Sequence, residues 1–191
     1  MSSPEKIRYP RELAEDVAKQ LTTSLEACCQ QIITVGSVRR LKPQVGDLEV
    51  LFIPRVIELT PSGEMFPRKF LATDVAIAQL LKDGVLSKRL KSNGTVTFGQ
   101  WNKLLVHVAT GLPVDLFATT PAGWWNNLVA RTGGKVMNVE IASSAIKQGM
   151  HWEMYGDCFS VDGTNTKIFP KSEKDVFDIV GKAYLEPHQR P

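Results

Sequence analysis

A glycine-serine turn followed by two closely spaced carboxylates constrains this chain more than any other feature. Residues 35–40 read Val-Gly-Ser-Val-Arg-Arg, and residues 45–51 read Val-Gly-Asp-Leu-Glu-Val-Leu. The apolar residues of the second segment predict a buried strand, on which Asp47 and Glu49 point to the same face. Two neighbouring carboxylates repel each other, and a bound cation removes that conflict. The stretch therefore predicts a metal site on a rigid strand, with a phosphate-binding turn beside it.

A third acid strengthens the metal interpretation. An Asp-x-Glu pair alone more often marks a solvated strand face, and a Gly-Ser pair is weaker still. Residues 112–117, however, predict a second apolar strand with a single acid, Asp115. Asp47, Glu49 and Asp115 can hold two Mg²⁺ ions, because carboxylates are the hard ligands that magnesium prefers, and we expect Mn²⁺ to be able to substitute. Such a pair of ions clamps the attacking and leaving oxygens in phosphoryl transfer.

The turn before these acids suits a triphosphate. Gly36 lets the backbone approach a phosphate closely, Ser37 offers a hydroxyl, and Arg40 offers a planar guanidinium to the β and γ oxygens. A solvated turn is the alternative for both arginines, and Arg39 fits either interpretation equally well.

A second basic segment lies between residues 82 and 103, where one acid accompanies several cations. We expect contacts with the backbone of duplex DNA from Lys88, Arg89, Lys91 and Lys103. An exposed hairpin without a ligand explains the same pattern equally well.

The composition is that of a globular protein. The 191 residues are 43% hydrophobic and 23% charged, with a net charge of +3 that permits nucleic acid as a partner without requiring it. No apolar run approaches the ~20 residues of a membrane span, so no membrane partner is expected. The three cysteines fit neither a disulfide framework nor a zinc motif. We expect a reducing intracellular compartment, either the cytoplasm or, for a virus-encoded protein, the host cell, and the nucleus fits equally.

The order of predicted elements favours an α+β fold. Residues 11–30 form an amphipathic helix, and a helix over 73–82 is followed by several strand-like segments. Successive strands favour a mixed or antiparallel sheet with helices on one face over repeated βαβ units. The pattern then changes to helices and short strands, which predicts one domain over 1–120 and a second over 121–191.

The Gly-Ser turn and the acidic strand together resemble the signature of the nucleotidyltransferase superfamily, and Gly-Ser-Val-Arg-Arg resembles the DNA polymerase X family. The resemblance runs in order through most of the chain. Residues 86–99 resemble the family's primer-side hairpin, residues 132–138 its nucleotide-holding motif, and residues 172–190 the end of its thumb. The resemblance implies a nucleotidyltransferase palm followed by a small α+β thumb. It also implies a minimal member of the family, without lyase or fingers domains.

The resemblance also implies a set of nucleotide contacts: Gly36, Ser37, Arg40, Gly46, Arg131, Thr132, Gly133, Gly134 and Asn138. The chain departs from the family's pattern at several positions, among them Pro113, where a basic residue is common, and Gly134, which lacks the family's serine hydroxyl. Glu49 replaces a second aspartate, Ala130 and Arg131 replace a Tyr-Phe pair that screens the sugar, and Ala142 stands where a template-probing arginine is common.

The function implied is a Mg²⁺-dependent DNA polymerase that extends a DNA 3′-hydroxyl, with Asp47, Glu49 and Asp115 as catalytic residues and gap filling in DNA repair or replication as its role. Its partners would be a primer-template or gapped DNA and a dNTP, with NTPs as an alternative, and the protein is expected to be a monomer. The alternatives are a template-independent terminal or RNA nucleotidyltransferase and a non-catalytic protein that binds DNA ends.

Overall fold

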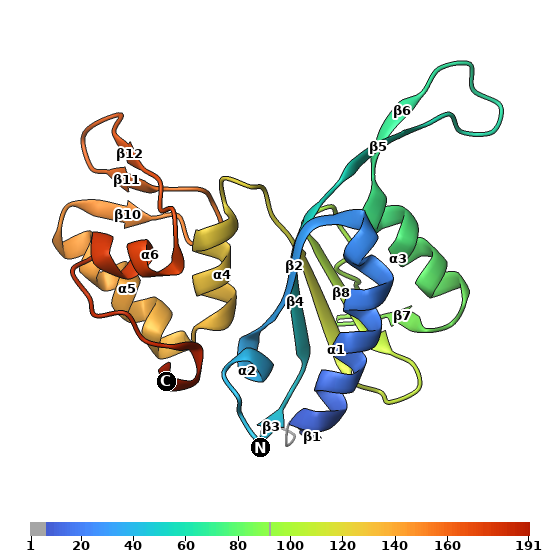
Figure 1. Ribbon diagram of the computed structural model, residues 1–191, viewed down its shortest axis with the longest axis horizontal. Helices are drawn as coiled ribbons and strands as arrows, with labels where there is room; N and C mark the ends of the chain where they lie inside the picture. Colours follow the sequence, from blue (N-terminus) through green and yellow to red (C-terminus); the bar gives the residue numbers. More distant parts are fainter. Residues whose placement is uncertain (1–6, 92) are drawn as a thin grey trace.

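The two apolar acidic strands lie side by side in a five-stranded mixed sheet. The computed structural model describes residues 7–91 and 93–191, which form two lobes (Figure 1). In the N-terminal lobe the strands follow the order β2-β4-β9-β8-β7. Their bounds are Cys29–Val35 for β2, Leu48–Pro54 for β4, Pro113–Ala118 for β9, Asn102–His107 for β8 and Leu86–Lys88 for β7. Strands β4 and β9 are parallel, and the other neighbours are antiparallel.

Two helices cover one face of this sheet, α1 (Arg11–Leu25) and α3 (Ala72–Lys82) (Figure 1). The apolar stripe of α1 packs on alternate sheet residues such as Val50, Val114 and Leu116. Because side chains alternate along a strand, this packing turns Glu49 and Asp115 to the opposite face. The core therefore fixes which face carries the acids.

The opposite face of the sheet is partly covered as well, by a helix that lies after residue 120. Helix α4 (Trp124–Thr132) packs Trp124 and Leu128 against Leu51 and Phe117 of the sheet. Since Leu51 and Phe117 follow Glu49 and Asp115 by two residues, the last turn of α4 lies near the acids.

The C-terminal lobe is a second α+β unit. After α4 come α5 (Lys135–Lys147), a three-stranded antiparallel sheet, and α6 (Glu173–Ile179). The strands are β10 (Met150–Trp152), β11 (Phe159–Val161) and β12 (Lys167–Ile168). Its core contains buried residues from each of these helices, including Val129, Ile141 and Phe177. A 3₁₀ turn, η2 (Pro187–Gln189), precedes the buried Arg190 near the C-terminus.

Smaller elements complete the N-terminal lobe. The Gly-Ser turn becomes the one-turn helix α2 (Gly36–Arg39), and a 3₁₀ turn, η1 (Glu26–Cys28), follows α1. Short strands β1 (Tyr9–Pro10) and β3 (Gln44–Val45) pair beside α2. A hairpin of β5 (Val56–Leu59) and β6 (Arg68–Leu71) projects away from the lobe (Figure 1).

The predicted α+β class with a mixed sheet is thus confirmed. Among the described residues, no helix has both the length and the apolar composition needed to cross a membrane.

Candidate active site

The three acids come from the starts of the two parallel strands. Glu49 and Asp115 are register partners on β4 and β9, and Asp47 lies just before β4. Burial and then repulsion from Asp47 and Asp115 raise the pKa of Glu49 to about 7. The pKa of Asp115 is also raised, first by burial. Ionising these buried, neighbouring carboxylates is therefore unfavourable, and a bound divalent cation would stabilise their charged forms.

Glycine is required at the turn beside these acids. Gly36 has a positive φ of +66°, and a Cβ there would overlap the Oε2 atom of Glu49. The backbone of α2 therefore lies directly against the Glu49 carboxylate, whereas the sequence predicted a close approach to a phosphate at this residue.

Arg89, one of the expected DNA contacts, lies beside the acids. Its guanidinium forms an ion pair of 2.7 Å with Asp115, which lowers the pKa of that carboxyl against the larger effect of burial. The oxygens of Asp47, Glu49 and Asp115 do not all lie within 4.8 Å of one another in this conformation.

Arg131 lies between two aromatic rings at the edge of the acids. Its Cζ atom is 3.5 Å from the ring centre of Phe117 and 4.3 Å from that of Tyr155. Its Nε atom is buried and has no hydrogen-bond partner in the described part of the chain. Its positive charge lowers the pKa of Glu49 and of Asp115, so it acts as a counter-ion for the cluster.

Ser37 and Arg40 differ in how they use their polar groups. The Ser37 hydroxyl is buried and has no partner within the described residues. Arg40 donates a hydrogen bond to the Thr132 carbonyl, and burial lowers its pKa. The Ser37 hydroxyl thus keeps an unused donor among the described residues, whereas Arg40 connects α2 to the end of α4.

Arg39 also connects the two lobes. Its guanidinium forms a bidentate pair with Glu173 at 2.7 and 2.8 Å and donates to the Thr132 hydroxyl. Glu173 accepts a further bond of 3.1 Å from the fully buried Arg190. Both arginines lower the pKa of Glu173, and the network fixes the C-terminal lobe beside the Gly-Ser turn.

The predicted nucleotide-holding segment forms the corner between α4 and α5. Asn138 donates to the Ala130 carbonyl at 2.8 Å, and its Oδ1 atom is buried without a partner in the residues described. A Cβ at Gly133 would lie 2.8 Å from that Oδ1, and one at Gly134 would overlap the Pro191 carbonyl. Gly46 is buried in the turn between β3 and β4.

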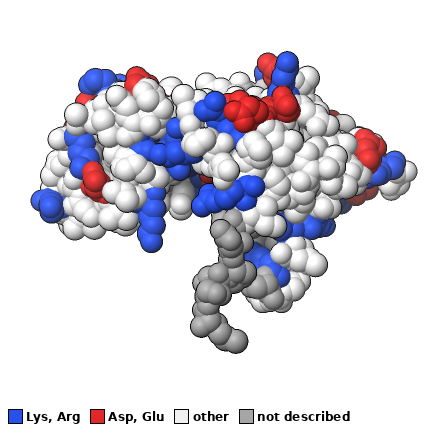
Figure 2. Space-filling model, turned by 90° about the horizontal axis from the view of Figure 1, so that it is seen from below, with Lys and Arg blue, Asp and Glu red and all other residues white. Residues whose placement is uncertain are grey.

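The remaining predicted DNA contacts separate into exposed and buried cations. Lys91 is exposed, and the exposed Lys88 places its Nζ 4.5 Å from the ring centre of Phe98. Lys103, by contrast, is 3% exposed and pairs with Asp74 at 2.7 Å, so in this conformation it is not a surface cation. Lys and Arg side chains instead gather over the junction of the lobes in the view of Figure 2.

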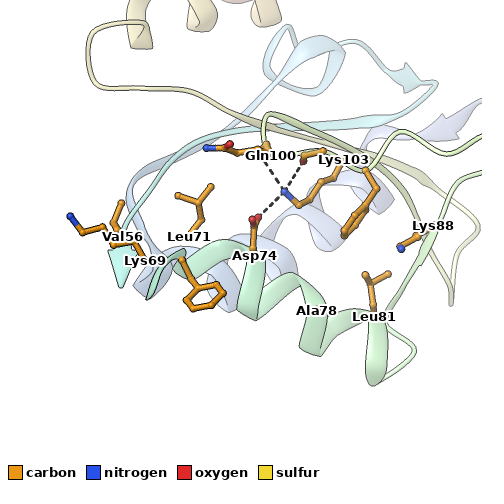
Figure 3. Close-up of a pocket in the computed structure, with 12 residues that line it drawn as sticks. Val56, Lys69, Leu71, Asp74, Ala78, Leu81, Lys88, Gln100 and Lys103 are labelled. Atoms are coloured by element: carbon orange, nitrogen blue, oxygen red, sulfur yellow. Dashed lines mark hydrogen bonds and ion pairs between the residues drawn. The ribbon is translucent and has the colours of Figure 1, made fainter. Parts of the chain in front are cut away.

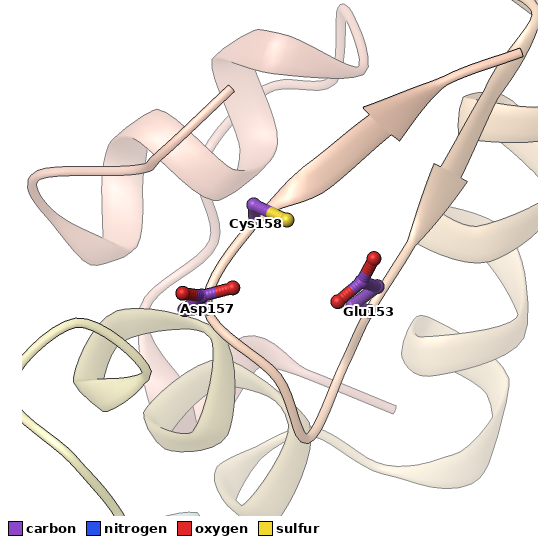
Figure 4. Close-up of side chains that lie close together, drawn as sticks. All are labelled: Glu153, Asp157 and Cys158. Atoms are coloured by element: carbon purple, nitrogen blue, oxygen red, sulfur yellow. The ribbon is translucent and has the colours of Figure 1, made fainter. Parts of the chain in front are cut away.

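A second group of possible ligands lies in the C-terminal lobe, where Glu153, Asp157 and Cys158 approach one another (Figure 4). Burial raises the pKa of the Cys158 thiol to about 11, so the thiol is protonated at neutral pH. A thiol in that state is a poor metal ligand, and we assign no metal to this group.

Sequence reasoning assigned no role in the site to four residues that shape it. Phe117 and Tyr155 hold Arg131, and Glu173 and Arg190 hold Arg39. The two pairs Arg39–Glu173 and Arg89–Asp115 join residues far apart in the chain, and neither lies at a local spacing that a sequence pattern reveals.

Residues 127–191 match the family model of the DNA polymerase beta thumb. The match covers the C-terminal third of the chain and supports the resemblance to polymerase-beta-like proteins there. A search of curated proteins found no match.

Proposed function

We propose that this chain is a Mg²⁺-dependent nucleotidyltransferase that adds nucleotides to a DNA 3′-hydroxyl, as a DNA polymerase acting at short gaps. In this proposal the N-terminal lobe is the palm and the C-terminal lobe is the thumb. The observation that carries it is the arrangement of Glu49 and Asp115 as neighbours on parallel strands, with Gly36 against Glu49 and a polymerase-beta-like thumb at the junction.

Asp47, Glu49 and Asp115 are the residues that would hold the metal ions. The fit rests on the donor set and its surroundings, because oxygen ligands suit Mg²⁺, and burial and then repulsion from Asp47 and Asp115 make the charged form of Glu49 unfavourable without a cation. When bound, the ions would supply Lewis acidity for phosphoryl transfer and lower the pKa of the attacking hydroxyl.

The protein's own residues would hold the triphosphate. The Ser37 hydroxyl, which has no partner among the described residues, would donate a hydrogen bond to a phosphate oxygen, and Gly36 holds the turn against Glu49, next to the proposed metal ligands. Arg40 lies next to this turn and would add a charge-assisted bond when it exchanges the Thr132 carbonyl for phosphate.

Arg131 would respond to the change in charge at the acids. It is the counter-ion on the α4 side, and added positive charge at Glu49 would repel it. The neighbouring cavity of about 550 Å³, which Arg131 and Tyr155 line, gives the side chain room to move. The residues at 132–138 would form the second wall for the nucleotide.

Primer extension tests the proposal. Purified protein is given Mg²⁺, labelled dNTPs or NTPs, and single-stranded, nicked or one-nucleotide-gapped DNA. Templated dNTP addition that is fastest at the gap and stops with EDTA supports the proposal. Addition without regard to template would identify a terminal transferase, and binding to DNA ends without any addition would identify a non-catalytic protein.

A further inference from the structure

A cavity of about 550 Å³ lies between the two lobes, on the side of the sheet that carries the acids. Its lining combines aromatic rings with hydrogen-bonding side chains from both lobes, among them Trp101, Asn102, Thr119, Arg131, Tyr155 and Asp157. Arg131 also stacks on Phe117, which follows Asp115 by two residues on β9, so the cavity adjoins the acids without including them. Its volume falls in the range of about 300–1,000 Å³ that is typical of a site for one small ligand.

A larger cavity of about 770 Å³ lies at the base of the β5–β6 hairpin, on the side of the sheet that the helices cover (Figure 3). Lys103 pairs there with Asp74 at 2.7 Å and donates to the Gly99 carbonyl at 3.0 Å, as the dashed lines of Figure 3 show. These polar groups already have partners within the chain. Of the two cavities, the smaller one is therefore the one that adjoins the acids.

The smaller cavity is close to neutral, which distinguishes it from a phosphate site. Among the described residues that line it, Arg131 is basic and Asp157 is acidic. The charge of Arg131 also acts on Glu49 and Asp115, because it lowers the pKa of both carboxyls. A phosphate backbone would instead need an excess of positive charge. The cavity therefore suits an uncharged ligand.

The aromatic rings of this cavity are only partly covered by the protein. Trp101 is 49% exposed and Tyr155 is 58% exposed, although both line the cavity. Asn102 is exposed next to Trp101 and offers an amide that can both donate and accept hydrogen bonds. The Nε atom of Arg131 is buried without a partner in the described part of the chain. Aromatic rings, an amide and a guanidinium are the groups with which proteins hold an unstacked nucleobase.

We propose that this cavity is a subsite for one unpaired nucleobase of the template strand, which leaves the base stack inside a gap and lies against Trp101. The inference rests on the DNA substrate of the proposed function but not on its chemistry.

Two observations favour template DNA as the source of the base. The side of the cavity that contains Arg131, Tyr155 and Asp157 lies within residues 127–191, which match the DNA polymerase beta thumb. The cavity also adjoins the acids at which the DNA end would react. An unpaired base in a gap has no partner to lose, so it leaves the stack at a lower cost than a base of the duplex.

Binding to gapped DNA with one base removed tests the subsite. Wild type and Trp101→Ala are titrated, in EDTA and without nucleotide, with DNA in which each unpaired template nucleotide in turn is abasic. For wild type, we expect one position at which loss of the base weakens binding about 5–150-fold, the range of base–aromatic stacking. Trp101→Ala should bind intact DNA more weakly by a similar factor, and the same abasic site should then cost little more.

The control Phe169→Ala removes another ring that is 50% exposed, in the C-terminal lobe, and should keep the wild-type pattern. Since Trp101 is about as exposed as Phe169, its variant should fold, and an unchanged melting curve verifies this. The abasic series on wild type alone decides the question if the Trp101 variant does not fold.

Fluorescence of 2-aminopurine locates the base directly. At the sensitive template position it should be quenched when wild type binds, because stacking on a ring quenches it, and should stay brighter with Trp101→Ala. Equal binding of intact and abasic DNA at every position, no quenching at any position, or no binding of gapped DNA would each overturn the inference. Release of the quenched base by a free dNTP would also overturn it, because the occupant would then be the incoming nucleotide. Base-dependent binding without nucleotide addition would support the subsite and refute only the proposed catalysis.

Discussion

Replacing Glu49 by glutamine should stabilise the metal-free protein at neutral and alkaline pH. Burial and two neighbouring acids raise the pKa of Glu49 from 4.5 to about 7. The folded state therefore keeps a proton that the unfolded state releases at lower pH, and the resulting stability is lost as the pH rises through 7. A shift of this size corresponds to at most about 3 kcal/mol. Glutamine has nearly the same shape and carries no charge, so it avoids this loss.

Thermal melting in EDTA between pH 5 and 8.5 measures the effect. For a chain of this length 1 kcal/mol shifts the midpoint by roughly 2–4 °C, so we expect Glu49→Gln to melt several degrees above wild type at pH 8 and close to it at pH 5. Adding Mg²⁺ should raise the wild-type midpoint more than that of the variant. The control Glu58→Gln removes an exposed carboxylate and should follow wild type. A variant that melts below wild type at pH 8, or a difference that does not change with pH, would refute the reasoning.

Three further substitutions test other parts of the account. Arg131→Gln removes a counter-ion of the acids, so Mn²⁺ measured by electron paramagnetic resonance should bind more tightly than to wild type; equal or weaker binding would argue against this role. Ser37→Ala should leave the melting curve unchanged, because the hydroxyl has no partner among the described residues, and should raise the nucleotide KM about tenfold; an unchanged KM would remove Ser37 from the phosphate site. Glu173→Ala leaves Arg190 buried without its carboxylate and should cost about 3–5 kcal/mol in urea unfolding; a loss below 1 kcal/mol would show that the network is not structural.

The positions of the acids followed from local patterns. The apolar residues around Asp47, Glu49 and Asp115 predicted two buried strands, and period-two alternation predicted that Asp47 and Glu49 would share a face. The structure pairs these strands directly and in parallel. The fold class could be predicted for the same reason, since the hydrophobic periods of strands and helices are local properties of the sequence.

The hydrogen-bond and ion-pair partners of the basic residues could not be predicted from the sequence. Arg39 and Arg40 looked like a phosphate-binding turn, and in the structure both reach Thr132, more than 90 residues away. Lys103 looked like a surface cation because lysine is rarely buried, yet Asp74 and two backbone carbonyls satisfy it inside the lobe. Such pairings depend on how elements that are distant in the sequence pack together. The local spacing of residues in the sequence therefore does not predict them.

The most direct test of the central claim compares Asp115→Asn with Asp162→Asn in single-turnover nucleotide addition to gapped DNA with Mg²⁺. Asp115 lies beside Glu49 on the sheet, whereas Asp162 is exposed in a turn of the C-terminal lobe. The account predicts that the Asp115 variant keeps its fold and loses about a thousandfold in rate, because a metal ligand supplies several kcal/mol of transition-state stabilisation, while the Asp162 variant matches wild type. Equal rates for all three proteins would contradict the account.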